Sequence, residues 1–278
     1  MKWAICNETF VDWPHQRAFE FAAECGYTGI EIAPFTLGSD VRAIDAAMRS
    51  QTRMLAERAG LEVVGLHWLL AKTSGLHLTS PDAEVRRRTG DYLADLAHLC
   101  RDLGGSILVL GSPQQRNLLP GVSPAEGTAH AQEVIERALP ALEETGTVLG
   151  IEPLSAADGN FLLTAAEGAE LVRRLGSPHC RLHLDCKAMS SETEFGKTLP
   201  IPELIRRHRA DLVHFHANDP NLRGPGFGEL DFKPILAALN ETGYDGWVSV
   251  EVFDYSPGPE RLARESIDYL CRSTVPPH

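Results

Sequence analysis

Short apolar runs alternate along the chain with longer segments of mixed polarity, and a glycine often marks the junction between the two. The apolar runs are rich in Val, Ile and Leu and have little polar–apolar alternation, which is typical of parallel strands buried on both faces. Eight such strands are expected over residues 3–7, 29–33, 61–68, 106–111, 148–152, 181–185, 212–216 and 247–251.

The segments between these runs carry helical signals. Several end at a glycine, as in Cys25-Gly26, Ala59-Gly60 and Thr145-Gly146, and glycine directly after a helix is typical of a left-handed C-terminal cap. Helices are expected over residues 14–24, 40–58, 80–102, 164–175, 202–209, 231–241 and 259–271, with a further helix opening at 123–126.

About eight strand–helix units within 278 residues predict an α/β fold in which residues 1–278 form a single (β/α)8 TIM barrel domain. A doubly wound open sheet is the alternative architecture. Against it, the turn after the first expected strand contains no Gly-x-Gly-x-x-Gly phosphate-binding motif.

The net charge, the apolar stretches and the cysteines indicate which partners and which cellular compartment to expect. The chain has 38 acidic and 26 basic residues and a net charge of −12, which repels a phosphate backbone, so no nucleic-acid partner is expected. No apolar stretch approaches the roughly 20 residues needed to cross a bilayer, so no membrane partner is expected. Six cysteines without a Cys-x-x-Cys pair, and a start unlike a signal peptide, predict a reduced cytoplasmic protein.

The last four expected strands end on chemically similar residues: Glu152, Asp185, His216 and Glu251. In a barrel of this class the carboxyl ends of the strands converge on one site. Three carboxylates gathered there would repel one another, and a divalent cation is the simplest compensation. The sequence therefore predicts one divalent metal ion, with Mn²⁺ as the first expectation and Co²⁺, Mg²⁺ or Zn²⁺ as alternatives.

Residues two positions before these ligands share their inward face because side chains alternate along a strand. These positions hold Gly150, His183, His214 and Ser249, a small or polar set that we expect to hydrogen-bond the ligands from beneath. Glu31 is also expected to point inward, and the sequence does not identify its partner.

Several residues near strand ends are candidates for substrate contacts. The tryptophans among them would form an apolar wall for a sugar ring, and the arginines and lysine would meet hydroxyls or a phosphate. Core packing is the competing interpretation for the tryptophans, and surface solvation is the competing interpretation for the charged residues. The expected substrate contacts are His67, Trp68, Trp13, Arg116, Lys187, His214 and Arg223.

A set of motifs occurs in a defined order along the second half of the chain: Ile151-Glu152-Pro153, His183-Leu184-Asp185, His214-Phe215-His216, the glycine-rich segment 224–228, and 243–246 leading to Val250-Glu251. In this order they resemble the sugar phosphate isomerase/epimerase family of xylose isomerase-like TIM barrels. Within that family they are nearest to ketose 3-epimerases acting on tagatose and psicose.

The resemblance implies that Glu152, Asp185, His216 and Glu251 hold one divalent metal. It also implies that Glu152 and Glu251 act as an acid/base pair on opposite faces of the substrate, and it suggests a homodimer or homotetramer. Two positions depart from the family pattern, because Ala188 stands where a histidine follows the aspartate ligand and Leu222 stands where a substrate arginine is usual. We therefore expect substrate recognition to differ.

The expected function is that of a divalent-metal-dependent sugar isomerase or epimerase that abstracts a proton next to a carbonyl of a ketose or keto-sugar. A metal-dependent dehydratase or lyase acting on an inosose or 3-keto sugar is one alternative, because it begins with the same proton abstraction. A non-catalytic sugar-binding barrel is another. An endonuclease IV-type site is disfavoured because the additional histidines it needs are absent and the net charge is negative.

Overall fold

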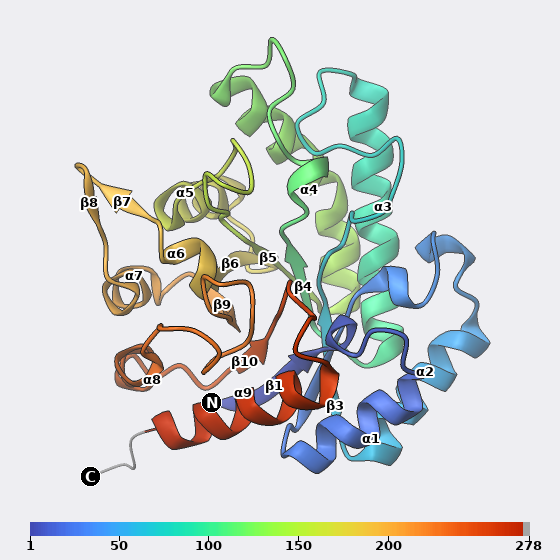
Figure 1. The fold of residues 1–278 in the computed structure, drawn as a ribbon. Helices are drawn as coiled ribbons and strands as arrows, with labels where there is room; N and C mark the ends of the chain where they lie inside the picture. The colour runs from blue at the N-terminus through green and yellow to red at the C-terminus, as the bar shows by residue number, and fades with distance from the viewer. Residues whose placement is uncertain (275–278) are drawn as a thin grey trace.

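Eight parallel strands close into a barrel in the computed structural model, which describes residues 1–274, and helices surround the barrel on the outside (Figure 1). The strand order around the barrel is β1-β10-β9-β6-β5-β4-β3-β2. This arrangement confirms the predicted (β/α)8 barrel. The strands are β1 (Lys2–Cys6), β2 (Gly29–Ile32), β3 (Glu62–Leu66), β4 (Ile107–Leu110), β5 (Val148–Ile151), β6 (Cys180–Asp185), β9 (Leu212–Ala217) and β10 (Trp247–Val250).

Helices of varied length connect the strands, and within residues 1–274 none is long and apolar enough to span a membrane. The longer helices are α1 (His15–Cys25), α2 (Ala46–Ala59), α3 (Ala83–Leu103), α4 (Pro124–Thr145), α5 (Ala165–Leu175), α7 (Ile201–His208), α8 (Phe232–Glu241) and α9 (Pro259–Ser273). Shorter turns are α6 (Cys186–Met189), η1 (Asn7–Thr9), η2 (Pro34–Thr36), η3 (Val41–Ala43) and η4 (Pro113–Gln115).

One local prediction was wrong, and one element was not predicted. The helix expected over residues 40–58 is divided, because Asp45 caps α2 by accepting a hydrogen bond from the backbone of Met48, and the preceding turn η3 is separate. A hairpin of β7 (Thr193–Glu194) and β8 (Lys197–Thr198) stands away from the barrel in Figure 1 and was not predicted. Strands of two residues are too short to show an alternating pattern.

The two faces of each strand are buried against different partners. In β4, Leu108 and Leu110 belong to the large core between the barrel and its helices, whereas Ile107 and Val109 belong to a small apolar cluster inside the barrel. This division follows from the alternation of side chains along a strand. Inward positions nearer the carboxyl ends of several other strands carry histidine, glutamate and aspartate instead, so the barrel interior becomes polar at one end.

Candidate active site

Four side chains of metal-ligand type meet at the carboxyl ends of β5, β6, β9 and β10. Glu152 follows β5 directly and Glu251 follows β10, while Asp185 is the last residue of β6 and His216 is the last but one of β9. Each offers an oxygen or nitrogen atom within 4.8 Å of those of the other three, and all four side chains are buried. The structure thus brings together the four residues predicted to hold a metal, which we call the quartet.

The quartet brings three carboxyl groups and only one imidazole together, so its carboxylates repel one another. Burial, followed by repulsion from Glu251 and Asp185, raises the pKa of Glu152 to about 8. Burial, followed by repulsion from Glu251, raises the pKa of Asp185 to about 6. Burial also acts to raise the pKa of Glu251, but attraction to His216 outweighs it and lowers that pKa. A bound cation would relieve these repulsions.

Glu31 fixes the orientation of the His216 ring. Nδ1 of His216 lies 3.0 Å from Oε2 of Glu251, and its Nε2 lies 3.1 Å from Oε1 of Glu31. Glu31 is fully buried, and although burial acts to raise its pKa, His214 and His216 hold that pKa well below its usual value. A carboxylate on one nitrogen leaves the other nitrogen directed at the quartet, as in many histidine metal ligands. This contact supplies the partner of Glu31 that the sequence did not identify.

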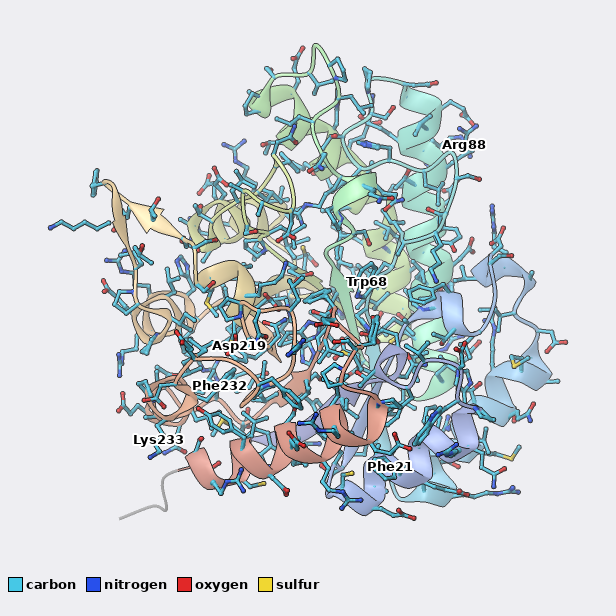
Figure 2. The ribbon with its side chains drawn as sticks, viewed as in Figure 1. Phe21, Trp68, Arg88, Asp219, Phe232 and Lys233 are labelled. Carbon is cyan, nitrogen blue, oxygen red and sulfur yellow. The ribbon has the colours of Figure 1, made fainter. Side chains whose placement is uncertain are left out.

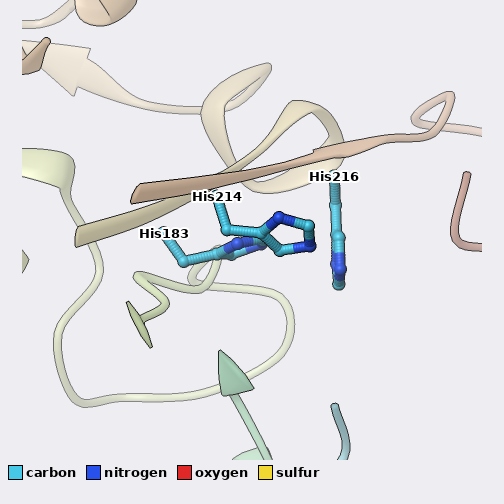
Figure 3. A group of neighbouring side chains, drawn as sticks. All are labelled: His183, His214 and His216. Carbon is cyan, nitrogen blue, oxygen red and sulfur yellow. The ribbon is translucent and has the colours of Figure 1, made fainter. Parts of the chain in front are cut away.

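The layer beneath the quartet includes polar side chains, as expected, but His214 hydrogen-bonds Glu31 rather than a member of the quartet. Nε2 of His214 lies 2.8 Å from Oε2 of Glu31, and Oγ of Ser249 lies 3.4 Å from the same nitrogen. The ring of His183 stands 4.2 Å from that of His216 at an angle of 75°, and Figure 3 shows the three histidines grouped in this way. His214, one of the expected substrate contacts, is fully buried there and does not line the cavity.

A cavity of about 210 Å³ opens above the quartet and is lined by Glu152, Asp185 and Glu251. Its walls include the apolar side chains of Trp68, Leu154, Leu222 and Phe253. Trp68, which is labelled near the centre of Figure 2, donates from Nε1 to Oε1 of Glu251 over 2.8 Å. A buried ionised group surrounded by apolar walls and a few polar anchors is typical of a small-molecule site.

Two further predicted residues line this cavity. His67 directly follows β3, and its Nε2 lies 2.7 Å from Oε2 of Glu8, which is buried beside it. Lys187 donates from Nζ to Oδ2 of Asp158 over 2.7 Å. His67, Lys187 and Trp68 are therefore the members of the predicted substrate-contact set that the structure places at the cavity.

Three other expected substrate contacts, Arg116, Arg223 and Trp13, do not line this cavity. Arg116 is only 1% exposed, and its guanidinium donates to backbone carbonyls of Glu152, Phe161 and Leu162. Arg223 instead pairs with Asp254 over 2.8 Å, while the preceding Leu222 lines the cavity. Trp13 packs against aromatic neighbours and lines a different cavity next to this one.

Two residues that hold the site were missed in the sequence. Asn218 donates from Nδ2 to Oδ2 of Asp185 and accepts from the backbone N–H of Lys187. Glu8 holds His67, as described above. Asn218 stands two positions beyond the inward-facing His216, so the period of two could have been continued past the end of β9 to find it. Glu8 lies in the turn η1 after β1, where that period does not apply.

We expect Arg116→Met to destabilise the fold. Methionine preserves much of the buried volume but leaves the carbonyls of Glu152, Phe161 and Leu162 without their donor, which should lower the free energy of unfolding by about 3 kcal/mol or more. Urea unfolding would measure this. Arg223→Met is the control, since loss of a partly exposed ion pair should change that free energy by less than about 1 kcal/mol. Equal effects of both variants would contradict the role given to Arg116.

Comparison with known proteins places this geometry in a family. The sequence profile described as xylose isomerase-like TIM barrel matches residues 19–273. The chain belongs to this family. Among curated relatives, a putative hydroxypyruvate isomerase from Streptomyces coelicolor is 28% identical over 261 residues, covering 87% of this chain and 86% of the relative. A probable ketose 3-epimerase from Synechocystis sp. is 25% identical over 269 residues, covering 91% of this chain and 88% of the relative.

Solved structures show the same fold. A D-psicose 3-epimerase from Clostridium cellulolyticum H10, with D-tagatose, superposes with a TM-score of 0.84 at 19% identity, covering 98% of this chain and 99% of the other. A 3-keto-D-glucoside 4-epimerase from E. coli gives a TM-score of 0.83 at 20% identity, with coverage of 98% and 99%. The curated relatives are epimerases and isomerases by name, which confirms the prediction of an isomerase-type enzyme.

Proposed function

We propose that this protein is a divalent-metal-dependent epimerase or isomerase of a ketose or keto-sugar, with Glu152 and Glu251 as its acid/base pair. The observation that carries the proposal is the quartet itself, which is buried beneath a cavity with apolar walls. The ketose 3-epimerases among the relatives support the reaction class.

The donor set fits a hard or borderline divalent cation. Three carboxylates and one imidazole suit Mn²⁺, Co²⁺ or Mg²⁺, and we propose Mn²⁺ as the ion held by Glu152, Asp185, His216 and Glu251. When bound, such an ion polarises a carbonyl oxygen and so acidifies the hydrogen on the neighbouring carbon. Asn218 and Glu31 would keep Asp185 and His216 in place.

The two glutamates stand on opposite sides of the quartet. Strands β5, β6, β9 and β10 are neighbours in that order around the barrel, so Glu152 and Glu251 flank Asp185 and His216. A sugar bound between them would have one carboxylate on each face. One glutamate removes the proton from the carbon next to the carbonyl, and the other returns a proton to the opposite face, which inverts that carbon. Trp68 holds one oxygen of Glu251 during these transfers.

Metal analysis and isotope exchange together test this function. We expect about one Mn²⁺ per chain after loading and its loss in Asp185→Ala, together with deuterium uptake from D₂O at a carbon next to the carbonyl of D-fructose, D-tagatose or another ketose. A rearranged sugar of unchanged composition supports epimerisation or isomerisation, whereas loss of water identifies a dehydratase. Failure to bind any divalent ion under all loading conditions would overturn the proposal.

The stability of the metal-free protein should depend on pH in a defined direction. The pKa of Glu152 is raised from 4.5 to about 8, so between these values the folded state holds a proton that the unfolded state has lost. Stability therefore falls as the pH rises through this window. The pKa of His216 is raised as well, because Glu31 and Glu251 outweigh the effect of burial, and it contributes in the same direction above 6.5.

Metal binding replaces the proton on Glu152, so Mn²⁺ should raise the Tm by more at about pH 8 than at about pH 6. Differential scanning fluorimetry with and without Mn²⁺ measures this difference. Glu152→Gln removes the titrating group and should flatten the decline in stability of the metal-free protein. A wild-type Tm that does not fall across this window without metal would contradict the assignment.

A further inference from the structure

A second cavity of about 510 Å³ lies beside the cavity above the quartet. Trp68 lines both cavities, so the two adjoin at this side chain. The second cavity is rich in aromatic side chains, and Trp68 meets the ring of Phe35 edge-on at 6.3 Å. The other aromatic residues that line it are Phe10, Trp13 and Tyr255. Aromatic faces of this kind pack against the apolar faces of sugar rings and similar ligands.

A buried carboxylate connects the second cavity to the reacting site. Glu8 lines the second cavity and is 6% exposed. Its Oε2 contacts His67, while its Oε1 is buried and has no hydrogen-bond partner among the described residues. Glu8 and Glu251 also offer oxygens within 4.8 Å of each other and of a nitrogen of His67. A ligand that extends past Trp68 from the quartet would therefore reach an unused acceptor.

The unsatisfied oxygen of Glu8 indicates what the ligand must supply. A buried acceptor without a donor costs free energy, and a hydroxyl that donates to it would recover that cost. Ketose carbons at the quartet would use Glu251 and its neighbours, so the donor to Glu8 must come from a different part of the molecule. The second cavity is also larger than the first, and a one-ring sugar at the quartet would leave it unfilled.

We propose that the second cavity binds a further sugar ring attached to the reacting ketose, so that the substrate is a glycosylated keto-sugar. In this complex the second ring packs beside Trp13, Phe35 and Tyr255, and one of its hydroxyls donates to Oε1 of Glu8. The inference rests on the proposed function, because it names the substrate class of the same reacting site. It also gives Trp13 a role in binding sugar at a place other than the one predicted.

The test compares one-ring and two-ring ketoses on the Mn²⁺-loaded protein. Isothermal titration calorimetry gives the affinity for D-fructose, D-tagatose, lactulose and isomaltulose, and deuterium uptake in D₂O gives kcat/KM for each. Val11 is 45% exposed on the rim of the second cavity, so Val11→Trp should fill the cavity without disturbing the core. Phe195→Ala is the control, because Phe195 is an aromatic residue of the β7–β8 hairpin that is 99% exposed and lines neither cavity.

We expect the wild-type protein to bind a two-ring ketose at least about tenfold more tightly than a one-ring ketose. Val11→Trp and Trp13→Ala should each reduce that preference by about tenfold, whereas Phe195→Ala should retain it. Glu8→Gln should reduce it as well, because the amide replaces one of the two carboxylate oxygens with a donor.

The binding measurement tests the subsite, and the turnover measurement tests the proposed function. If two-ring sugars bind through the second cavity but no sugar exchanges deuterium, the proposed function fails and the subsite stands. If one-ring ketoses turn over and none of the variants alters the preference for two-ring sugars, the function stands and the subsite is refuted. Tighter binding of an amine-bearing ketose, such as a fructosyl amino acid, than of either disaccharide would overturn the assignment to a sugar ring.

Discussion

Replacing Glu251 or Glu152 with glutamine is expected to lower kcat by about a hundredfold to ten-thousandfold. Glutamine is close in size to glutamate and can still offer an oxygen to a metal, but it cannot accept or return a proton at neutral pH. Each variant removes one half of the proposed acid/base pair. Steady-state kinetics on a ketose that the wild-type protein converts, together with metal analysis of each variant, measures the effect.

A partial reaction distinguishes the two glutamates. If one glutamate removes the proton and the other returns it, a variant lacking only the second group should still exchange the substrate hydrogen with D₂O while forming little epimer. Glu192→Gln is the matched control, because Glu192 is also buried but lines neither cavity and accepts a hydrogen bond from the backbone of Ala165. Retention of full turnover in both Glu152→Gln and Glu251→Gln would refute the acid/base assignment, whereas sugar binding without turnover in the wild-type protein and in both variants would favour a sugar-binding barrel.

The sequence was most informative where a strand ends. Parallel strands in a barrel leave a strong local pattern, a short apolar run followed by one polar residue, and topology alone then brings the ends together. For this reason Glu152, Asp185, His216 and Glu251 could be grouped without coordinates, and the structure places their ligand atoms within 4.8 Å of one another. The inward polar layer followed from the same period of two.

Residues in the loops were harder to interpret, because a loop side chain can turn toward the cavity, the core or solvent. Arg116 follows a strand end yet is buried under backbone carbonyls, a reversal of direction that no periodicity encodes. Leu222 and Arg223 are adjacent, and a left-handed backbone at Leu222, with φ of 73°, helps decide which of the two lines the cavity. Such conformations are set by the folded loop rather than by local pattern.

The sequence indicates that Glu31 is a buried charge but does not indicate which residues it contacts. Its inward position could be inferred from the pattern of β2, but its partners His214 and His216 lie on β9, more than 180 residues further along the chain. Only closure of the barrel brings these strands near one another. The expected consequence of removing this charge is therefore the sharpest test of how the interior supports the quartet.

We expect Glu31→Gln to weaken both the fold and the metal site. The variant removes the negative charge that holds two buried imidazoles, which should lower the free energy of unfolding by about 3 to 5 kcal/mol. It also releases Nε2 of His216, and loss of a carboxylate behind a histidine ligand typically lowers metal affinity by about ten- to a hundredfold. Urea unfolding of the metal-free protein and calorimetric titration with Mn²⁺ measure the two effects separately.

Glu62→Gln provides the control for this variant. Glu62 begins the neighbouring strand β3, its side chain is 67% exposed, and its ion pair with Lys2 lies in solvent, so its removal should alter the unfolding free energy by less than about 1 kcal/mol. The control should bind Mn²⁺ as the wild-type protein does. A Glu31→Gln protein that loses stability but keeps wild-type Mn²⁺ affinity would show that Glu31 supports the barrel interior without orienting His216. Because stability and Mn²⁺ affinity are measured independently, that outcome would leave the quartet as the metal site. It would refute only the claim that Glu31 supports metal binding through His216.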